Sequence, residues 1–438
     1  MVMSHEQKIG VIADQLKKYK SKEPISLKKK TVPHQVPKPN DKYYSDNKIY
    51  IGDLTDIISI DPDKKICIAE PGVTFVDLVK ATLKYNLIPL TVPEHKTITI
   101  GGAVAGCSIE SMSHKYGGFH DSCLEYEVIT AKGEIITCSP QNENLLFQMM
   151  HGTFGTLGII SKLKFKLIDA KPFVKVKYEK YPTLKEYKAA IWRHFKSKDV
   201  DFMDGFLDSP KEFILSVGNF VDKAPYTHSY DWTRVYYPSI KSRDEDYLKT
   251  INYLFRYDKG HIHSNIRSFI GRLLFGKLGG SNSVLEFVNA FHRLIPAEKI
   301  PIVVDLFIPF SRIDDFVRWY EKEINFFPIW CVPYKPNHGY EWLSPKFISK
   351  KDDGLVLDIA IYDLKKEEGK NYYRMMEEEI MRLKGIKTLI SNNYFSKKEF
   401  WKIWNKKNYD KIKKITDPNN IFRDLYDKTC KASMGIGR

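Results

Sequence analysis

Residues Thr97 to Gly118 read TITIGGAVAGCSIESMSHKYGG, a stretch dense in glycine and serine with few signals for a regular helix or strand. The glycines permit close backbone approach and the serines supply hydroxyl donors, so successive amides can form a nest for a diphosphate. We expect a long loop on a scaffold, a place where function often lies. Composition alone leaves two interpretations open: a site for an elongated anionic cofactor, or a tight connection between two packed subdomains.

The whole chain of 438 residues has the composition of a folded protein, with 43% hydrophobic and 28% charged residues. These values argue against a disordered or collagen-like protein, and the length predicts about two to three domains. Lysine and arginine number 69 against 54 acidic residues, a net charge of +15 that is spread along the sequence. This spread favours a lysine-rich surface over one basic block. Without a cleavable leader or a membrane-length apolar run, we expect a cytoplasmic protein.

Several familiar site patterns are missing from the sequence. The cysteines are scattered without a C-x-x-C, and no H-E-x-x-H occurs, so we predict free thiols and no metal site. No G-x-G-x-x-G occurs either, which argues against a nicotinamide-type Rossmann site. The run Gly271–Lys277 (GRLLFGK) resembles the front of a P-loop, but Leu278 stands where a magnesium-binding hydroxyl is needed.

The pattern of the sequence changes after Lys171. Before it we predict a helix over residues 8–19, a second helix capped by Thr74, and a hairpin over 124–139. After it, strand-like and helical patterns are mixed, with strands over 173–181, 213–221, 302–308 and 355–362 and amphipathic helices over 312–324 and 371–383, the latter stopped by Gly385. A capping box at Ser396 begins a last helix that we expect to end near Asp417. The fold class is therefore predicted to be α+β.

Four motifs in order resemble the FAD-binding domain of the vanillyl-alcohol oxidase and p-cresol methylhydroxylase (PCMH) superfamily. They are Ala69–Val73 (AEPGV), Thr99–Gly102 (TIGG), Tyr126–Gly133 (YEVITAKG) and Gly152–Gly158 (GTFGTLG). Within this superfamily, Gly106–Gly117 (GCSIESMSHKYG) resembles the Δ24-sterol reductase branch. The similarity extends over most of the sequence from about Asp56 onward.

The resemblance implies a PCMH-type FAD-binding domain of two subdomains over residues 1–171, an α+β cap (substrate) domain over 172–386, and a segment 387–438 that returns to the flavin. It also implies that FAD is bound by Thr99, Ile100, Gly101, Gly102, Ala103, Val104, Ala105, Gly106, Cys107, Ser108, Ile109, Glu110, Ser111 and Gly117, and on the adenine side by Gly155, Gly158, Ile159 and Ile160. The run Asp417–Phe422 (DPNNIF) resembles a closing motif that lies near the cofactor, and the alternative is that Asp417–Pro418 is a plain helix stop.

One part of the sequence departs from the superfamily. Its first phosphate-binding turn is normally rich in glycine, whereas the corresponding stretch Ser26–Gln35 contains none. The lysines Lys28 to Lys30 either offset the diphosphate charge or form an exposed basic edge strand. Some relatives tether FAD covalently, but neither His34 nor Cys107 stands in a convincing motif, so we expect non-covalent FAD.

The resemblance favours NADPH-dependent reduction of a C=C bond in the side chain of a sterol or isoprenoid. An isolated alkene accepts a hydride only if its other carbon is protonated, so the site needs flavin N5 and a general acid. The candidate acids are Glu110, His114, Lys115, Tyr116, Asp358 and Tyr394. Each also has a structural interpretation: packing for a tyrosine, an ion pair between Glu110 and Lys115, or a satisfied buried group for Asp358. The alternative function is an FAD-dependent alcohol or hydroxy-acid oxidase or dehydrogenase.

Two basic amphipathic stretches suggest further contacts. Residues 263–279 could lie peripherally on a membrane and admit an apolar substrate, or form a core-facing helix of the cap. Residues Lys397–Lys414 could bind nucleic acid or an anionic membrane, or pack their aromatic face into the core. We expect no specific nucleic-acid partner.

Overall fold

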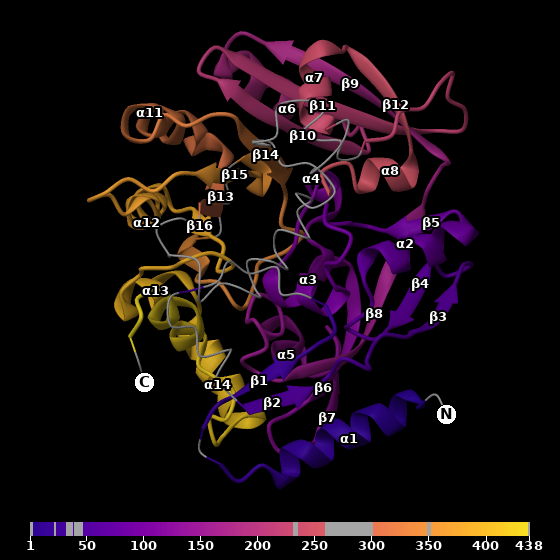
Figure 1. Cartoon of the computed structure of the whole chain (residues 1–438), viewed down its shortest axis with the longest axis vertical. Coiled ribbons are helices and arrows are strands. Elements are labelled where there is room, and N and C mark those ends of the chain that lie inside the picture. Colours follow the sequence, from indigo (N-terminus) through magenta and orange to yellow (C-terminus); the bar gives the residue numbers. More distant parts are fainter. Residues whose placement is uncertain are drawn as a thin grey trace, which may run out of the picture.

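The computed structural model describes residues 3–21, 23–31, 38, 47–230, 235–258, 301–347 and 352–436. Figure 1 shows two sheets, one in the lower half of the molecule and one in the upper half, with the C-terminal helices beside the lower one. The predictions for His34, for residues 263–279 and for the run 271–277 lie outside the described residues.

The lower sheet is built from the first part of the sequence. Its antiparallel strands follow the order β3 (Ile57–Asp61), β4 (Ile66–Ala69), β8 (Ile159–Asp169), β6 (Cys123–Ile129) and β7 (Ile135–Cys138), and β5 (Leu87–Pro89) also pairs with β8. Packed with this sheet in one core are α2 (Phe75–Thr82), α3 (Ile100–Gly106) and α5 (Asn144–Met149). The predicted hairpin is confirmed, with Ile129 opposite Ile135, and so is the helix capped by Thr74.

A smaller unit lies beside this sheet. Strands β1 (Ile25–Lys28) and β2 (Asn47–Tyr50) pair in parallel, and helix α1 (His5–Lys18) packs against them through Ile9, Ile12 and Leu16. The predicted first helix is thus confirmed, and its start lies at the capping box formed by Ser4 and Gln7.

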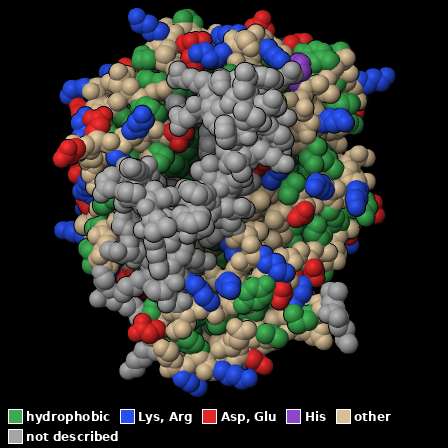
Figure 2. Space-filling view, in the orientation of Figure 1, with side chains coloured by type: hydrophobic (Ala, Val, Ile, Leu, Met, Phe, Trp, Pro, Cys, Tyr) green, Lys and Arg blue, Asp and Glu red, His purple; other side chains and the backbone are tan. Residues whose placement is uncertain are grey.

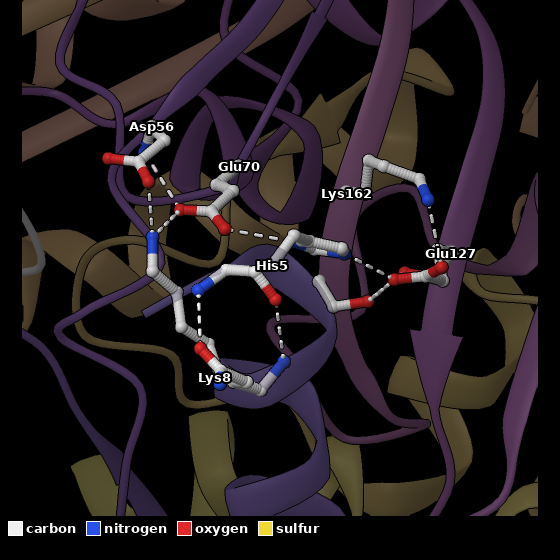
Figure 3. A network of polar contacts seen from close by, with 9 residues as sticks. His5, Lys8, Asp56, Glu70, Glu127 and Lys162 are labelled. Atoms are coloured by element: carbon white, nitrogen blue, oxygen red, sulfur yellow. Dashed lines mark hydrogen bonds and ion pairs between the residues drawn. The ribbon is translucent and has the colours of Figure 1, made fainter. Parts of the chain in front are cut away.

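A polar network fastens α1 to the lower sheet. Figure 3 shows the ring of His5 between Glu70 and Glu127, with 2.8 Å from a ring nitrogen to a carboxylate oxygen on each side. The Lys8 ammonium lies 2.9 Å from Glu70 and 2.5 Å from Asp56. Lys8 and Glu70 are both buried, so each charge would be unfavourable without the opposite charge of its partner. This ion pair therefore fixes the position of α1.

The upper sheet has eight antiparallel strands. Their order is β12 (Glu245–Lys249), β9 (Phe173–Tyr181), β11 (Glu212–Val221), β10 (Phe202–Ser209), β14 (Ile329–Tyr334), β15 (Val356–Leu364), β13 (Ile302–Pro309) and β16 (Ile386–Lys387). The four strands predicted after Lys171 all belong to it. The alternation of apolar residues along them gives the sheet two buried faces.

The two faces of the upper sheet pack against different partners. One face forms a core with α6 (Leu184–Ser197), α11 (Ile313–Glu323) and α12 (Tyr372–Leu383). The other, which we call the inward face, shares a core with the lower sheet and with α7 (Tyr236–Ser242) and α8 (Thr250–Leu254). The register places Trp330, Val332 and Asp358 on this inward face, toward the first part of the sequence.

Residues 97–118 differ from the expected long loop, because they contain α3 and the short helix α4 (Ser113–Tyr116). The Thr99 hydroxyl caps α3 by accepting a hydrogen bond from the Gly102 amide at 3.3 Å. Ile100, Ala103 and Val104 on the buried side of α3 enter the core. This apolar contact outweighs the weak helix propensity of the glycines.

The C-terminal segment also differs from its prediction. The capping box at Ser396 is confirmed, but the helix stops at Ile403, and a second one follows: α13 (Lys397–Ile403) and α14 (Lys406–Thr416). Trp404 is extended because it pairs with Leu343, and the Asn405 side chain then caps α14. A tertiary contact therefore breaks what the sequence presents as one helix.

The end of α12 is also corrected. Its left-handed residue is Lys384, with φ 59°, rather than Gly385. Gly385 is needed for a close approach instead, since a Cβ there would lie 2.6 Å from the carbonyl oxygen of Phe307.

The surface agrees with the predicted spread of positive charge. On the face shown in Figure 2, lysine and arginine side chains are scattered among acidic and apolar ones rather than gathered in one block. In the part of the sequence that the structure describes, none of the helices combines the length and apolar character needed to cross a membrane. The aromatic residues Phe400, Trp404 and Tyr409 of the segment 397–414 are buried in the core.

Candidate active site

A cavity of about 510 Å³ lies where three parts of the sequence meet. The first part contributes Gly106, Cys107, Ile109, Gly152 and Phe154. The inward face of the upper sheet and the segment after it contribute mainly aromatic and apolar side chains: Phe307, Pro309, Tyr334, Tyr340, Trp342, Leu343, Phe347 and Val356. The C-terminal part closes the cavity with residues 384–389 and Trp404.

The cavity edge requires a glycine at position 152. Gly152 has a φ of +65°, and a Cβ there would lie 3.3 Å from Cys107 Sγ and 3.4 Å from the ring of Trp342. The following loop is held by the C-terminal segment, because Tyr409 donates to the Thr156 hydroxyl at 3.0 Å and Lys428 donates to the Phe154 carbonyl at 2.6 Å. The segment 152–156 is therefore a fixed wall.

Lys29 is the feature that best fits an anionic group. Its ammonium group lies close to Gly102. A Cβ at position 102 would be 3.1 Å from Thr99 Oγ1 and 4.0 Å from Lys29 Nζ. Burial lowers the pKa of Lys29, and no acidic partner contacts it among the described residues. By contrast, Lys28 is exposed and Lys30 pairs with Asp53 at 3.1 Å. Of the two interpretations of this lysine run, charge compensation fits the position of Lys29, and an exposed basic edge fits that of Lys28.

The Asp417–Phe422 motif positions the strand that leads to Lys29. Asp417 is fully buried and accepts hydrogen bonds from the amides of Ile421 and Phe422, each at 2.9 Å. Phe422 in turn bridges to Ile25 of β1, whose amide donates to the Ile421 carbonyl at 2.9 Å. The motif is therefore more than a helix stop, because it supports strand β1.

The residues predicted to bind FAD surround these features. Gly106, Cys107 and Ile109 line the cavity. Ile100, Ala103 and Val104 bury their side chains in the core, so only their backbone groups could contact a cofactor. Gly155 lies beside Leu27 of β1, because a Cβ there would be 3.7 Å from Leu27 Cδ1. The buried Ile159 and Ile160 begin β8. A diphosphate beside Gly102 and Lys29 would supply a negative charge next to this buried ammonium, so the residues present fit FAD.

Cys107 is an unfavourable site for a covalent tether. Burial raises the pKa of its thiol well above the usual value, and the nearby negative charge of Asp121 adds to this effect. The thiolate is the form that reacts, so this thiol is held in its inert form.

Glu110 forms a buried ion-pair cluster rather than pairing with Lys115. Its Oε1 lies 2.9 Å from Arg256 Nη2, which lies 3.0 Å from Asp204 Oδ1 on β10. Asp204 also accepts hydrogen bonds from Tyr257 and Trp330. Burial raises the pKa of Glu110 to about 7, while the Arg256 charge acts in the opposite direction. The cluster links the 106–118 segment to the upper sheet.

The other acid candidates of the 106–118 segment lie away from the cavity wall. His114 is buried with Nδ1 2.9 Å from the Ser111 carbonyl oxygen, and burial lowers its pKa to about 4. Lys115 pairs with Asp201 at 3.1 Å and lies over the ring of Tyr116. A neutral, enclosed His114 is a poor proton donor at neutral pH.

Asp358 and Tyr394 also lie outside the cavity lining. Asp358 is buried on the inward face, where burial and then the negative charge of Asp305 and Glu94 raise its pKa well above the usual value. Burial likewise raises the pKa of Asp305 and of Glu94 to about 7. Tyr394 packs near Tyr373, by the helix-covered face of the upper sheet.

The structure brings a different group to the cavity, the pair Tyr334 and Tyr340. Their hydroxyl groups are hydrogen-bonded to each other, and Tyr340 donates to Asp121 Oδ2 at 2.7 Å. Sequence analysis missed this pair because no local motif marks it. The alternation of side chains between the two faces of β14 could have indicated Tyr334, because it places this residue on the same face as Val332.

Comparison with known proteins agrees with this geometry. Residues 44–139 match the family model described as FAD binding domain. The protein is 26% identical over 414 residues to Delta(24)-sterol reductase of Homo sapiens, an alignment that includes 90% of this chain and 79% of that protein. Identity to the enzyme of the same name is 27% over 420 residues in Mus musculus and 24% over 441 residues in Arabidopsis thaliana, with 90% and 88% of this chain and 79% and 76% of those proteins aligned.

The fold and the site define an FAD-linked oxidoreductase with a PCMH-type FAD-binding domain. Within this class the protein resembles the Δ24-sterol reductase branch along most of its length. The resemblance predicted from the motifs is thereby confirmed.

Proposed function

We propose that this protein reduces a C=C bond in the side chain of a sterol or isoprenoid, with NADPH as the electron donor. The observation that carries the proposal is the cavity of about 510 Å³, lined mostly by aromatic and apolar side chains, beside the predicted FAD segment. Its size is typical of small-molecule sites, and its lining suits an apolar substrate better than a hydroxylated one. The names of the relatives supply the reaction type.

Each part of the site has a role in this proposal. Lys29 and the backbone around Gly102 would hold the diphosphate of non-covalently bound FAD. When bound, FAD supplies the hydride for the alkene. Phe307, Trp342 and Val356 provide apolar surface that orients the substrate and excludes water.

The test begins with the visible spectrum of the purified protein. Acid precipitation should release the yellow colour to the supernatant, as expected for non-covalent FAD. The protein is then incubated with NADPH and a sterol whose side chain carries an isolated trisubstituted alkene, and mass spectrometry should show a gain of two hydrogens. NADPH oxidation with every sterol and prenyl alkene unchanged would contradict the proposal. Flavin bleaching by an alditol or hydroxy acid without NADPH would instead favour the alcohol-oxidising alternative.

The location of this activity stays a prediction. We expect it in the cytoplasm, with peripheral membrane contact through residues 263–279 giving access to apolar substrates. Co-sedimentation of the protein with anionic vesicles would test that contact.

A further inference from the structure

Four polar side chains follow one another along one edge of the cavity: Tyr334, Tyr340, Asp121 and His338. Tyr334 and Tyr340 line the cavity with their hydroxyls in contact, and Tyr340 donates to Asp121 at 2.7 Å. His338 also lines the cavity, and its Nε2 lies 3.5 Å from Asp121 Oδ1, an ion-pair distance without a hydrogen bond. The His338 side chain is 42% exposed and that of Asp121 is fully buried. The group therefore connects a half-exposed imidazole at the cavity edge with the Tyr334 hydroxyl on a mainly apolar cavity wall.

The backbone around Asp121 keeps this carboxylate in place. The Gly118 amide donates to Asp121 Oδ2 at 2.8 Å. Gly117 has a φ of +79°, and a Cβ there would overlap the same oxygen. Any larger residue at position 117 would displace Asp121, so this glycine is needed for a close approach.

The two tyrosines are suited to hold a proton until it is needed. Burial raises the pKa of both phenols well above the usual value, and the negative charge of Asp121 adds to the effect. Both phenols thus stay protonated near neutral pH. A buried phenolate would be costly, so any proton given away must be replaced quickly.

We propose that Tyr334, backed by Tyr340, donates the proton that completes alkene reduction, and that Asp121 and His338 return it from solvent. This inference rests on the proposed function. Tyr334 is then the catalytic residue, and the other three are positioning residues that act through it. None of the candidates predicted from the sequence combines a place on the cavity wall with a route to solvent.

Each turnover moves one hydride and one proton to the alkene. One alkene carbon gains the hydride supplied by the cofactor, and the other gains the Tyr334 proton as the C=C π bond breaks. The Tyr334 oxygen then takes the proton of Tyr340. Tyr340 is reprotonated by way of Asp121 and the half-exposed His338 side chain, which exchanges protons with water. The net reaction consumes one hydride and one solvent proton for each alkene.

The experiment compares Tyr334→Phe and Tyr340→Phe with Tyr178→Phe in the full-length, FAD-loaded protein. Tyr178 is a matched control, because it is a buried tyrosine of the same sheet whose hydroxyl contacts Tyr236 at 3.2 Å, outside the cavity. Rapid kinetics should follow flavin reduction by NADPH and flavin reoxidation by the alkene separately. The FAD spectrum and the melting temperature show whether each variant is folded.

Loss of a general acid should slow reoxidation by the alkene about 100-fold or more in Tyr334→Phe, with flavin reduction unchanged. Tyr178→Phe should keep the wild-type rates of both steps. Asp121→Asn should give a larger solvent deuterium isotope effect on reoxidation, a change that a purely structural role would not produce. Variants that reoxidise at the wild-type rate would overturn only the relay. A wild-type protein that reduces no alkene would overturn the proposed function and the relay together.

Discussion

In the proposed FAD site, Lys29 takes the place of the glycine-rich turn that the resemblance led us to expect. Burial disfavours the charged form of Lys29, and no acidic partner contacts it among the described residues, so a negatively charged ligand would stabilise its ammonium group. Lys29→Met should weaken FAD binding about 10- to 100-fold, the usual worth of a charged hydrogen bond. The measurement is a titration of apoprotein with FAD, followed by flavin fluorescence.

Lys28→Met is the control for this prediction, because Lys28 lies on the same strand with an exposed side chain. It should bind FAD as the wild type does. Equal affinities for the Lys29 variant and the control would mean that the diphosphate lies elsewhere.

Burial of Asp358 predicts that the stability of the protein depends on pH. Its pKa in the folded protein lies well above the ordinary value of 3.8, so the folded state holds its proton more tightly than the unfolded state does. The stability that Asp358 contributes is therefore complete below about pH 4 and decreases as the pH rises toward its folded pKa. Asp358→Asn removes this titration, so the variant should match wild type near pH 4 and exceed it in stability at about pH 8.

Urea unfolding at the two pH values measures this effect, and Asp314→Asn, at a half-exposed position on α11, is the control. A variant that is less stable than wild type at the higher pH would show that the ionised Asp358 carboxylate is needed there.

At the scale of elements, the ion-pair cluster of Glu110, Arg256 and Asp204 joins the 106–118 segment to strand β10. All three side chains are buried, so removing the cation leaves two carboxylates without their partner. Arg256→Met should lower the free energy of unfolding by about 3–5 kcal/mol. Chemical denaturation measures the change.

Arg318→Met serves as the comparison, because Arg318 is exposed on α11 and pairs with the neighbouring Asp315. Its effect should stay below about 1 kcal/mol. Similar losses in both variants would mean that the cluster contributes no more than a surface pair.

The strands of the upper sheet could be predicted from the sequence, because alternating burial leaves a period of two in the residues themselves. Helix α3 could not, since its formation depends on core contacts of Ile100 and Val104 rather than on propensity. The break at Trp404 likewise depends on pairing with Leu343, a residue far away in the sequence. Local pattern thus determined the elements wherever no distant partner overrode it.

The candidate site, too, could be predicted from the sequence only in part. Gly106, Cys107 and Ile109 of the predicted FAD segment line the cavity, and this segment could be singled out because its glycines and serines are contiguous and resemble a known family. The pair Tyr334 and Tyr340 could not be predicted, since it is recognised only by the hydrogen bond of Tyr340 to Asp121, which lies far earlier in the sequence. Glu110 and His114 looked suitable in sequence because they lie beside that segment, yet their side chains are committed to Arg256 and to the backbone.

At the scale of the whole molecule, one hydrophobic core runs through both sheets. It includes Phe165 of the lower sheet, Trp330 of the upper sheet and Phe400 of the C-terminal segment. The upper sheet has a second core with α6, α11 and α12, but its inward face belongs to the shared core, so we expect a single cooperative unfolding transition. Tryptophan fluorescence, near-ultraviolet circular dichroism and flavin release should give coincident midpoints in urea. Two separate transitions would show that the upper sheet unfolds independently.

The bridge between Ile25 and Phe422 affects how the protein folds during its synthesis. Strand β1 leaves the ribosome long before its neighbour Phe422 is synthesised. Domains generally fold as they emerge, yet here the approach to Lys29 stays incomplete until residue 422 is free. With FAD held at Lys29 as proposed, the cofactor would be acquired after translation has passed that point, and a ribosome stalled earlier would carry a nascent polypeptide unable to retain flavin.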